Sequence, residues 1–145
     1  MNRLRYIICV LSMMLAGCSG GAKNVALIEA ADKGNVSEVV RLIADGADVN
    51  ATALDGWRPL TMAADRGQLD VAAVLIASGA DVNGKIGLLS PMYFAARGGH
   101  TDVVKLIIDK GGRLDLPPEN HETFIRKINS YNNRELLKLL EKYVK

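Results

Sequence analysis

A hexapeptide that occurs twice limits the folds open to this 145-residue chain. The segment DGADVN at 45–50 returns as SGADVN at 78–83, and KGGRLD at 110–115 follows in the same register. The successive copies are therefore 33 and 32 residues apart. A fixed period of this length is typical of stacked copies of one small unit, in which each unit covers the next.

A second landmark has the same two spacings. AADKGN, AADRGQ and AARGGH begin at Ala30, Ala63 and Ala95. Between the landmarks each unit has the pattern of two short helices and a turn. Pro59 suits a first helical turn, and Gly67 suits the left-handed position that closes a helix. Residues 68–79 then predict a second, amphipathic helix, which closes at Gly79.

This pattern resembles the ankyrin repeat over residues 24–145. Arg-Pro-Leu-Thr at 58–61 and Ser-Pro-Met-Tyr at 90–93 stand where that family has Thr-Pro-Leu-His. The resemblance implies an all-α ankyrin-repeat solenoid of about four helix-turn-helix units joined by short hairpin loops, with atypical terminal units. It also places Met62 and Phe94 in the core.

Three departures from the family pattern predict local differences in structure. Ser90 is expected to cap its helix, whereas Arg58 cannot do so as a side-chain acceptor. The loop at 83–90 is one residue shorter than its counterpart, so we expect a distorted hairpin. Tyr131 stands where the last unit should have a glycine, so the sequence does not predict the conformation of that turn.

The N-terminus has the pattern of a secretory signal: basic MNRLR, apolar YIICVLSMML, then small residues. The apolar run is about half of the roughly 20 residues that a membrane-spanning helix needs. Leu15-Ala16-Gly17-Cys18 resembles the lipobox of bacterial lipoproteins. That resemblance implies cleavage between Gly17 and Cys18 and acylation of Cys18.

These features divide the chain into a signal peptide (1–17), a lipidated cysteine with a short tether (18–23) and the repeat domain (24–145). Ser19, rather than an aspartate, follows the cysteine, which resembles lipoproteins that reach the outer membrane and face the periplasm. More than one acyl chain would make such an anchor effectively permanent.

Charge and composition argue against several other functions. The chain has 18 Lys and Arg against 16 Asp and Glu, and because Arg3 and Arg5 belong to the predicted leader, the rest has no net charge. A nucleic-acid partner is therefore not expected. We also expect no enzyme activity, no cofactor, no metal and no small-molecule substrate. His100 is expected to make a structural hydrogen bond and His121 to lie in a turn. The predicted mature chain has no thiol besides Cys18, and no His, Cys and carboxylate cluster has metal-ligand spacing.

Binding to another protein is the function that we favour. The ankyrin resemblance implies that it uses the concave face, which the hairpin tips and the exposed ends of the first helices line. Trp57 and Arg58 are the first candidates, because tryptophan and arginine are enriched at interface hot spots; the alternative is that Trp57 packs over its own hairpin. The full set of expected contact residues is Leu54, Asp55, Trp57, Arg58, Asp65, Arg66, Lys85, Leu88, Leu89 and Arg97.

The partner itself is left open by the sequence. We expect a membrane-tethered module in the cell envelope that occludes or scaffolds its partner. One version is an immunity protein against an envelope-targeting toxin or lipase effector. The alternative is a protective factor that supports a periplasmic enzyme, for example one acting in oxidative stress.

Overall fold

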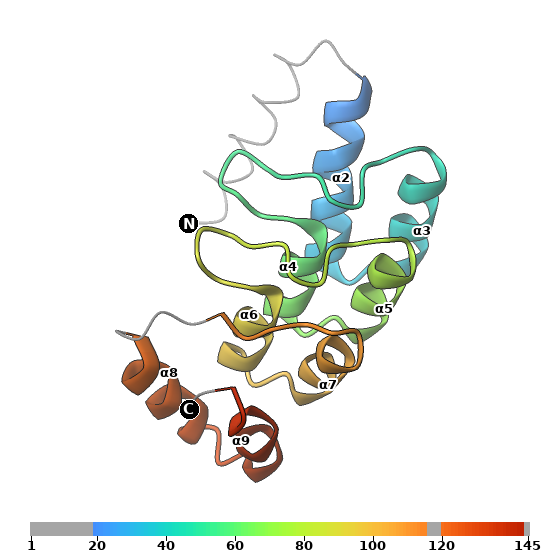
Figure 1. The fold of residues 1–145 in the computed structure, drawn as a ribbon. Helices are drawn as coiled ribbons and strands as arrows, with labels where there is room; N and C mark the ends of the chain where they lie inside the picture. Colours follow the sequence, from blue (N-terminus) through green and yellow to red (C-terminus); the bar gives the residue numbers. More distant parts are fainter. Residues whose placement is uncertain (1–18, 116–119, 144–145) are drawn as a thin grey trace.

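The computed structural model describes residues 19–115 and 120–143. The predicted cleavage site and Cys18 lie outside these residues. Within them the chain forms eight helices (Figure 1): α2 (Ser19–Lys33), α3 (Val36–Ala44), α4 (Pro59–Arg66), α5 (Leu69–Ala77), α6 (Pro91–Arg97), α7 (Thr101–Asp109), α8 (His121–Asn129) and α9 (Arg134–Leu140). His121 is thus the first residue of a helix rather than part of a turn.

The helices form two columns (Figure 1). The inner column consists of α2, α4, α6 and α8, and the outer column of α3, α5, α7 and α9. Each inner helix contacts the next inner helix and its own outer helix. The predicted all-α stack of helix pairs is therefore confirmed.

Small side chains allow the columns to approach. Ala63, Ala64, Ala95 and Ala96 are fully buried in the inner helices. Leucine, valine and isoleucine side chains from the outer helices complete one continuous core, including Val39, Val71, Leu75, Val103, Ile107 and Leu136. Met62 and Phe94 are 8% and 5% exposed, so both are core residues as expected.

The turn inside each pair needs a left-handed residue. Gly34, Gly67 and Gly99 have φ angles of 71°, 71° and 78°, and Asn132 takes the same position in the last pair with φ 50°. Asparagine tolerates this conformation better than most residues. The turn near Tyr131, whose conformation the sequence did not predict, is therefore formed with Asn132 as its left-handed residue.

Bridging asparagines join successive loops. The Asn50 Oδ1 accepts from Asp81 N at 2.8 Å, and its Nδ2 donates to Gly79 O at 3.1 Å. One repeat later, Asn83 makes the corresponding bonds to Arg113 N and Gly111 O, at 2.8 and 3.3 Å. The repeated Asp-Val-Asn segment therefore bonds each loop to the next.

Helix α2 is longer than the other inner helices at its N-terminal end. The Lys23 Nζ donates to Asp45 O at 2.7 Å, and the Asn24 Oδ1 accepts from Asp48 N at 2.8 Å. These bonds join α2 at Lys23 and Asn24 to the start of the first loop. Residues 19–23, expected to form a tether, are helical and continue into α2.

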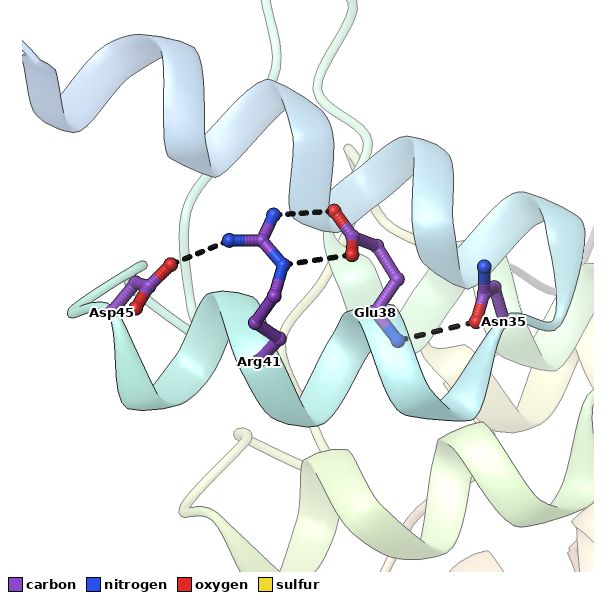
Figure 2. Close-up of polar contacts among 4 residues, drawn as sticks. All are labelled: Asn35, Glu38, Arg41 and Asp45. Atoms are coloured by element: carbon purple, nitrogen blue, oxygen red, sulfur yellow. Dashed lines mark hydrogen bonds and ion pairs between the residues drawn. The ribbon is translucent and has the colours of Figure 1, made fainter.

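The first outer helix is stabilised at both ends (Figure 2). Asn35 caps α3 by accepting from Glu38 N at 3.1 Å. The Arg41 guanidinium donates to both carboxylate oxygens of Glu38, at 2.9 and 2.6 Å, and to Asp45 Oδ2 at 2.6 Å. These hydrogen bonds lower the pKa of Glu38 and raise the pKa of Arg41.

In the part of the chain that the structure describes, no helix has both the length and the hydropathy that crossing a bilayer requires.

Candidate partner-binding face

Two hairpins project beside the inner column between successive helix pairs (Figure 1). In the first hairpin, which leads into α4, Ala53 N donates to Trp57 O at 2.8 Å and Gly56 N donates to Ala53 O at 2.9 Å. Leu54 lies at the tip and is 85% exposed. This leucine therefore extends into solvent.

The second hairpin, which leads into α6, is regular in spite of its shorter loop. Ile86 N donates to Leu89 O at 2.9 Å, and Leu89 N donates to Ile86 O at 3.1 Å. The expected distortion is wrong, because removing one residue leaves a two-residue connection, which is a favoured hairpin length. Leu88 lies in this connection and is 66% exposed, whereas Leu89 is half-buried.

The two hairpins lie close together at Gly56 and Ile86. A Cβ atom on Gly56 would lie 3.3 Å from Ile86 Cγ2, so a side chain there would crowd the second hairpin. Gly56 also has a φ angle of 87°, which disfavours other residues. The exposed leucines thus belong to two loops that lie against each other.

Trp57 packs on the following repeat. Its ring centroid lies 5.1 Å from that of Phe94 in α6, and Trp57 is half-buried against the core. The row continues with Tyr93, which contacts Phe94 edge to face at 5.4 Å and stacks on Phe124 at 5.2 Å. The sequence analysis did not identify Tyr93 and Phe124. The aromatic residues that recur in α6 and α8, the first helices of successive pairs, could have indicated this row of ring contacts.

Arg58 lies between loops rather than in solvent. Its Nη1 donates to Asn50 O at 3.5 Å, and a Cβ on Gly84 would come 3.3 Å from the same nitrogen. As expected, Arg58 makes no side-chain cap of α4.

Ser90 was expected to cap α6, but its side chain makes no cap hydrogen bond. Its Oγ donates instead to Arg113 O at 2.7 Å.

The expected contact residues Asp65, Arg66 and Arg97 form ion pairs within the chain. The Arg66 Nε lies 2.6 Å from Asp32 Oδ1, and the Arg97 Nη2 lies 2.7 Å from Asp65 Oδ1. The Arg97 guanidinium also lies 5.2 Å from the centre of the Phe94 ring. These pairs join successive inner helices, so their charges are partly satisfied before any partner binds.

Two further expected contact residues also have partners. The Lys85 Nζ lies 3.1 Å from Asp115 Oδ2, which joins the second hairpin to the following loop. Asp55 is exposed, and its carboxylate accepts a long hydrogen bond of 3.5 Å from Trp57 N. Of the ten expected contact residues, Leu54 and Leu88 are thus the large apolar side chains that face solvent.

The opposite end of the helix pairs carries a shallow depression. It is lined by Gly67, Leu69 and the segment 99–103, which includes His100. The His100 Nε2 lies 3.0 Å from Asp65 O in the preceding turn, so the expected structural hydrogen bond is confirmed. Among residues 19–115 and 120–143 there is no group of three or more His, Cys, Asp or Glu side chains that could hold a metal ion.

The stacked helix pairs and bridged loops define a helical repeat protein. Residues 6–86 match the sequence pattern of ankyrin repeats (three copies), a range that begins inside the predicted leader, and residues 88–117 match one further ankyrin repeat. The chain belongs to the ankyrin-repeat family. The pair α8 and α9 lies outside both matched ranges.

A curated protein is similar to part of this chain. A stretch of 42 residues is 52% identical to the mitochondrial disaggregase of Bos taurus. The match covers 29% of this chain and 6% of that protein. The likeness therefore concerns a short segment and not the whole relative.

Proposed function

We propose that this chain is a protein-binding module that uses the face formed by its hairpins and inner helices, here called the hairpin-side face. The observation that carries the proposal is that consecutive repeats contribute apolar and aromatic side chains to this face: Leu54 and Leu88 are exposed on the two hairpins, and the partly buried Trp57 and Tyr93 both pack on Phe94. The bonds of Asn50 and Asn83 hold these repeats in one arrangement. A preformed surface loses less conformational entropy when it binds.

Affinity capture from detergent-solubilised membranes tests this function. The native protein is compared with Trp57→Ala and Tyr93→Ala on the hairpin-side face and with Val40→Ser on α3, where the side chain is 50% exposed. We expect both face variants to retain less of one protein, while Val40→Ser retains the native amount. Circular dichroism establishes that each variant is folded. Loss of the captured protein in the Val40→Ser variant alone would contradict the proposal.

The same proposal includes a lipid anchor at Cys18 in the bacterial envelope, on the periplasmic side of the outer membrane. The support is the Leu15-Ala16-Gly17-Cys18 segment and the small, apolar and basic zones before it. Because α2 begins at Ser19, the packed domain would lie directly beside the anchor. The partner would then be reached at the membrane surface.

Mass spectrometry of the protein from membranes tests the anchor. We expect a mature chain that begins at an acylated Cys18, and we expect Cys18→Ser to leave the membrane fraction. Retention of residues 1–17 in the native protein, or membrane association of Cys18→Ser, would contradict the anchor without affecting the binding face.

Binding can serve occlusion or scaffolding, and a captured enzyme would distinguish them. An immunity protein that covers the active site of a toxic envelope enzyme, such as a lipase effector, would lower its activity in proportion to complex formed. A protective factor would leave the activity of a periplasmic enzyme unchanged or extend its lifetime under peroxide. Titrating this chain into the purified partner separates the two.

A further inference from the structure

Asn83 is followed by glycine, whereas Asn50, its counterpart one repeat earlier, is followed by alanine. The hydrogen bonds at the two sites are the same. Each asparagine side chain bonds to the next loop, and its own N–H donates to the carboxylate of the aspartate two residues before it. The following residue donates its N–H to the carbonyl of that aspartate, at 3.0 Å for Ala51 and 3.1 Å for Gly84. The chain therefore contains two matched sites that differ in the residue after the asparagine.

An asparagine that precedes glycine can lose its side-chain amide without an enzyme. The backbone nitrogen of the glycine gives up its proton and bonds to Cγ of the asparagine. The bond between Cγ and Nδ2 breaks, and the side-chain nitrogen takes up a proton and leaves as ammonia. Water then opens the five-membered imide ring at either carbonyl carbon, which gives aspartate or isoaspartate. Because glycine has no Cβ to hinder ring closure, Asn83 is much better suited to this reaction than Asn50.

In the folded chain, hydrogen bonds restrain both reacting groups. The Asn83 Oδ1 accepts from Arg113 N at 2.8 Å and its Nδ2 donates to Gly111 O at 3.3 Å, so the side chain is held toward the next loop. Gly84 is buried, and its N–H, which has to lose a proton, donates to Asp81 O. Ring closure therefore requires local opening of these bonds.

The products of the reaction do not restore the bridge between the loops. An aspartate at position 83 has no donor for Gly111 O, and it places a carboxylate oxygen where the amide nitrogen lies 3.3 Å from that carbonyl oxygen. Isoaspartate also adds one carbon atom to the main chain before Gly84, at the start of the second hairpin. Either product weakens the connection between the two loops.

We propose that Asn83 is a site of spontaneous deamidation, that its bonds to Gly111 and Arg113 limit the rate, and that the product loosens the loops on either side of the α6 and α7 pair. The reaction requires no reactant besides water and is independent of partner binding. Because ammonia is lost, each modified molecule stays modified. Deamidation therefore limits the time for which the stack keeps its native loop bridge.

Peptide mapping by mass spectrometry tests the site. The full chain, purified in detergent, is incubated at pH 8 and 37 °C, both folded and unfolded in urea. We expect modification of Asn83 to exceed that of Asn50 in both states, and to be about tenfold or more slower in the folded chain, where the bonds must open first. Three results would overturn the proposal: equal modification of Asn50 and Asn83 in the unfolded chain, equal rates at Asn83 in both states, or an intact Asn83 after several weeks in the folded chain.

Reciprocal variants test the role of the following residue. In the unfolded chain, Gly84→Ala should slow modification of Asn83 to the rate of Asn50, and Ala51→Gly should raise the rate of Asn50 to that of native Asn83. Use of the unfolded chain removes any effect of these changes on packing. Unchanged rates in both variants would show that glycine does not determine the site.

A third set of variants tests the bridge. Arg113→Pro removes the N–H that donates to the Asn83 Oδ1, and it should speed modification of Asn83 in the folded chain. Leu114→Ala, which removes a side chain that is 8% exposed in the same loop, should act in the same direction if the proline variant does not fold. Val39→Ala, in the distant helix α3, should leave the rate unchanged. An effect of Val39→Ala as large as that of the loop variants would mean that general stability, and not the bridge, limits the rate.

The effect of the product is measured on Asn83→Asp, which reproduces one of the two products. We expect a lower urea midpoint than that of the native protein, while Asn129→Asp, exposed on α8, keeps the native midpoint. A native midpoint in Asn83→Asp would overturn the proposed loosening of the stack.

Discussion

Asn50 joins two loops of the stack, because its side-chain oxygen accepts from Asp81 N at 2.8 Å while its amide nitrogen donates to Gly79 O at 3.1 Å. Both partners lie in the next repeat. The side chain of the repeated asparagine is therefore a connection between units.

Replacing Asn50 with alanine should lower the free energy of unfolding by about 1–3 kcal/mol, since two hydrogen bonds between repeats are lost. Asn129→Ala is the control, because Asn129 is exposed on α8. Urea denaturation followed by circular dichroism measures both. Equal stability of Asn50→Ala and the native protein would show that these loops are not stabilised by the asparagine.

Alanine substitutions at Gly67 and Gly79 distinguish the destabilisation caused by backbone strain from that caused by a side-chain collision. Both have positive φ, at 71° and 93°. A Cβ on Gly67 would collide with the His100 imidazole, whereas a Cβ on Gly79 meets nothing within 4 Å. Gly79→Ala should cost about 1–2 kcal/mol from the left-handed backbone alone, and Gly67→Ala should cost more.

A double substitution tests the cause of that difference. Adding His100→Ala to Gly67→Ala should recover part of the loss, because the imidazole that collides with the new methyl group is gone. Thermal unfolding of the two single variants and the double variant measures the coupling. Strictly additive losses would mean that the ring does not limit position 67.

The hydrogen-bonded pair of Glu38 and Arg41 in Figure 2 makes the stability of the protein depend on pH. The hydrogen bond from Arg41 holds the pKa of Glu38 below its ordinary value of 4.5. The stabilisation is therefore complete above that ordinary value and is lost as the pH falls through the lower folded pKa. In Arg41→Gln the pKa of Glu38 should rise toward 4.5.

Two measurements follow this change. Carbon NMR of the Glu38 carboxyl reports its pKa directly, and urea midpoints between pH 6 and pH 3 report the linked stability. The native protein should lose more stability than Arg41→Gln over this range. Identical Glu38 titration in both proteins would contradict the assignment.

The contact between Trp57 and Phe94 can be followed by fluorescence, because Trp57 is the only tryptophan in the chain. Phe94→Leu should shift the emission and lower the free energy of unfolding by about 0.5–1.5 kcal/mol through loss of the ring pair. Phe124→Leu, which removes a ring that stacks on Tyr93, should change the emission less. The reverse order would mean that Trp57 does not pack on α6.

Much of the fold could be predicted because its signals are local. Pro59 and Gly67 mark the ends of α4, and one period later Pro91 begins α6 while the left-handed Gly99 follows its C-cap, Gly98. The start of α2 at Ser19 was missed, because residues 19–23 carry no helix-start signal of their own and the bonds of Lys23 and Asn24 to the first loop form only in the folded chain.

The candidate site was harder to predict, because the residue types that suggest binding also suit contacts between repeats. Arg66 and Arg97 pair with aspartates from the preceding unit, and Trp57 packs on Phe94 from the following one. The exposure of Leu54 and Leu88 follows from the hairpin connections rather than from their residue type.

The sequence by itself determined the repeat, the helix pairs and the family, since a fixed period with proline and glycine at set positions limits the backbone locally. Only the tertiary structure decided which surface residues are free to meet a partner. The physical reason is that side chains such as Arg66, Arg97 and Trp57 contact residues of a neighbouring repeat more than 30 residues away, as Arg66 does with Asp32. Stacking brings such residues together, and the hairpin leucines are left in solvent.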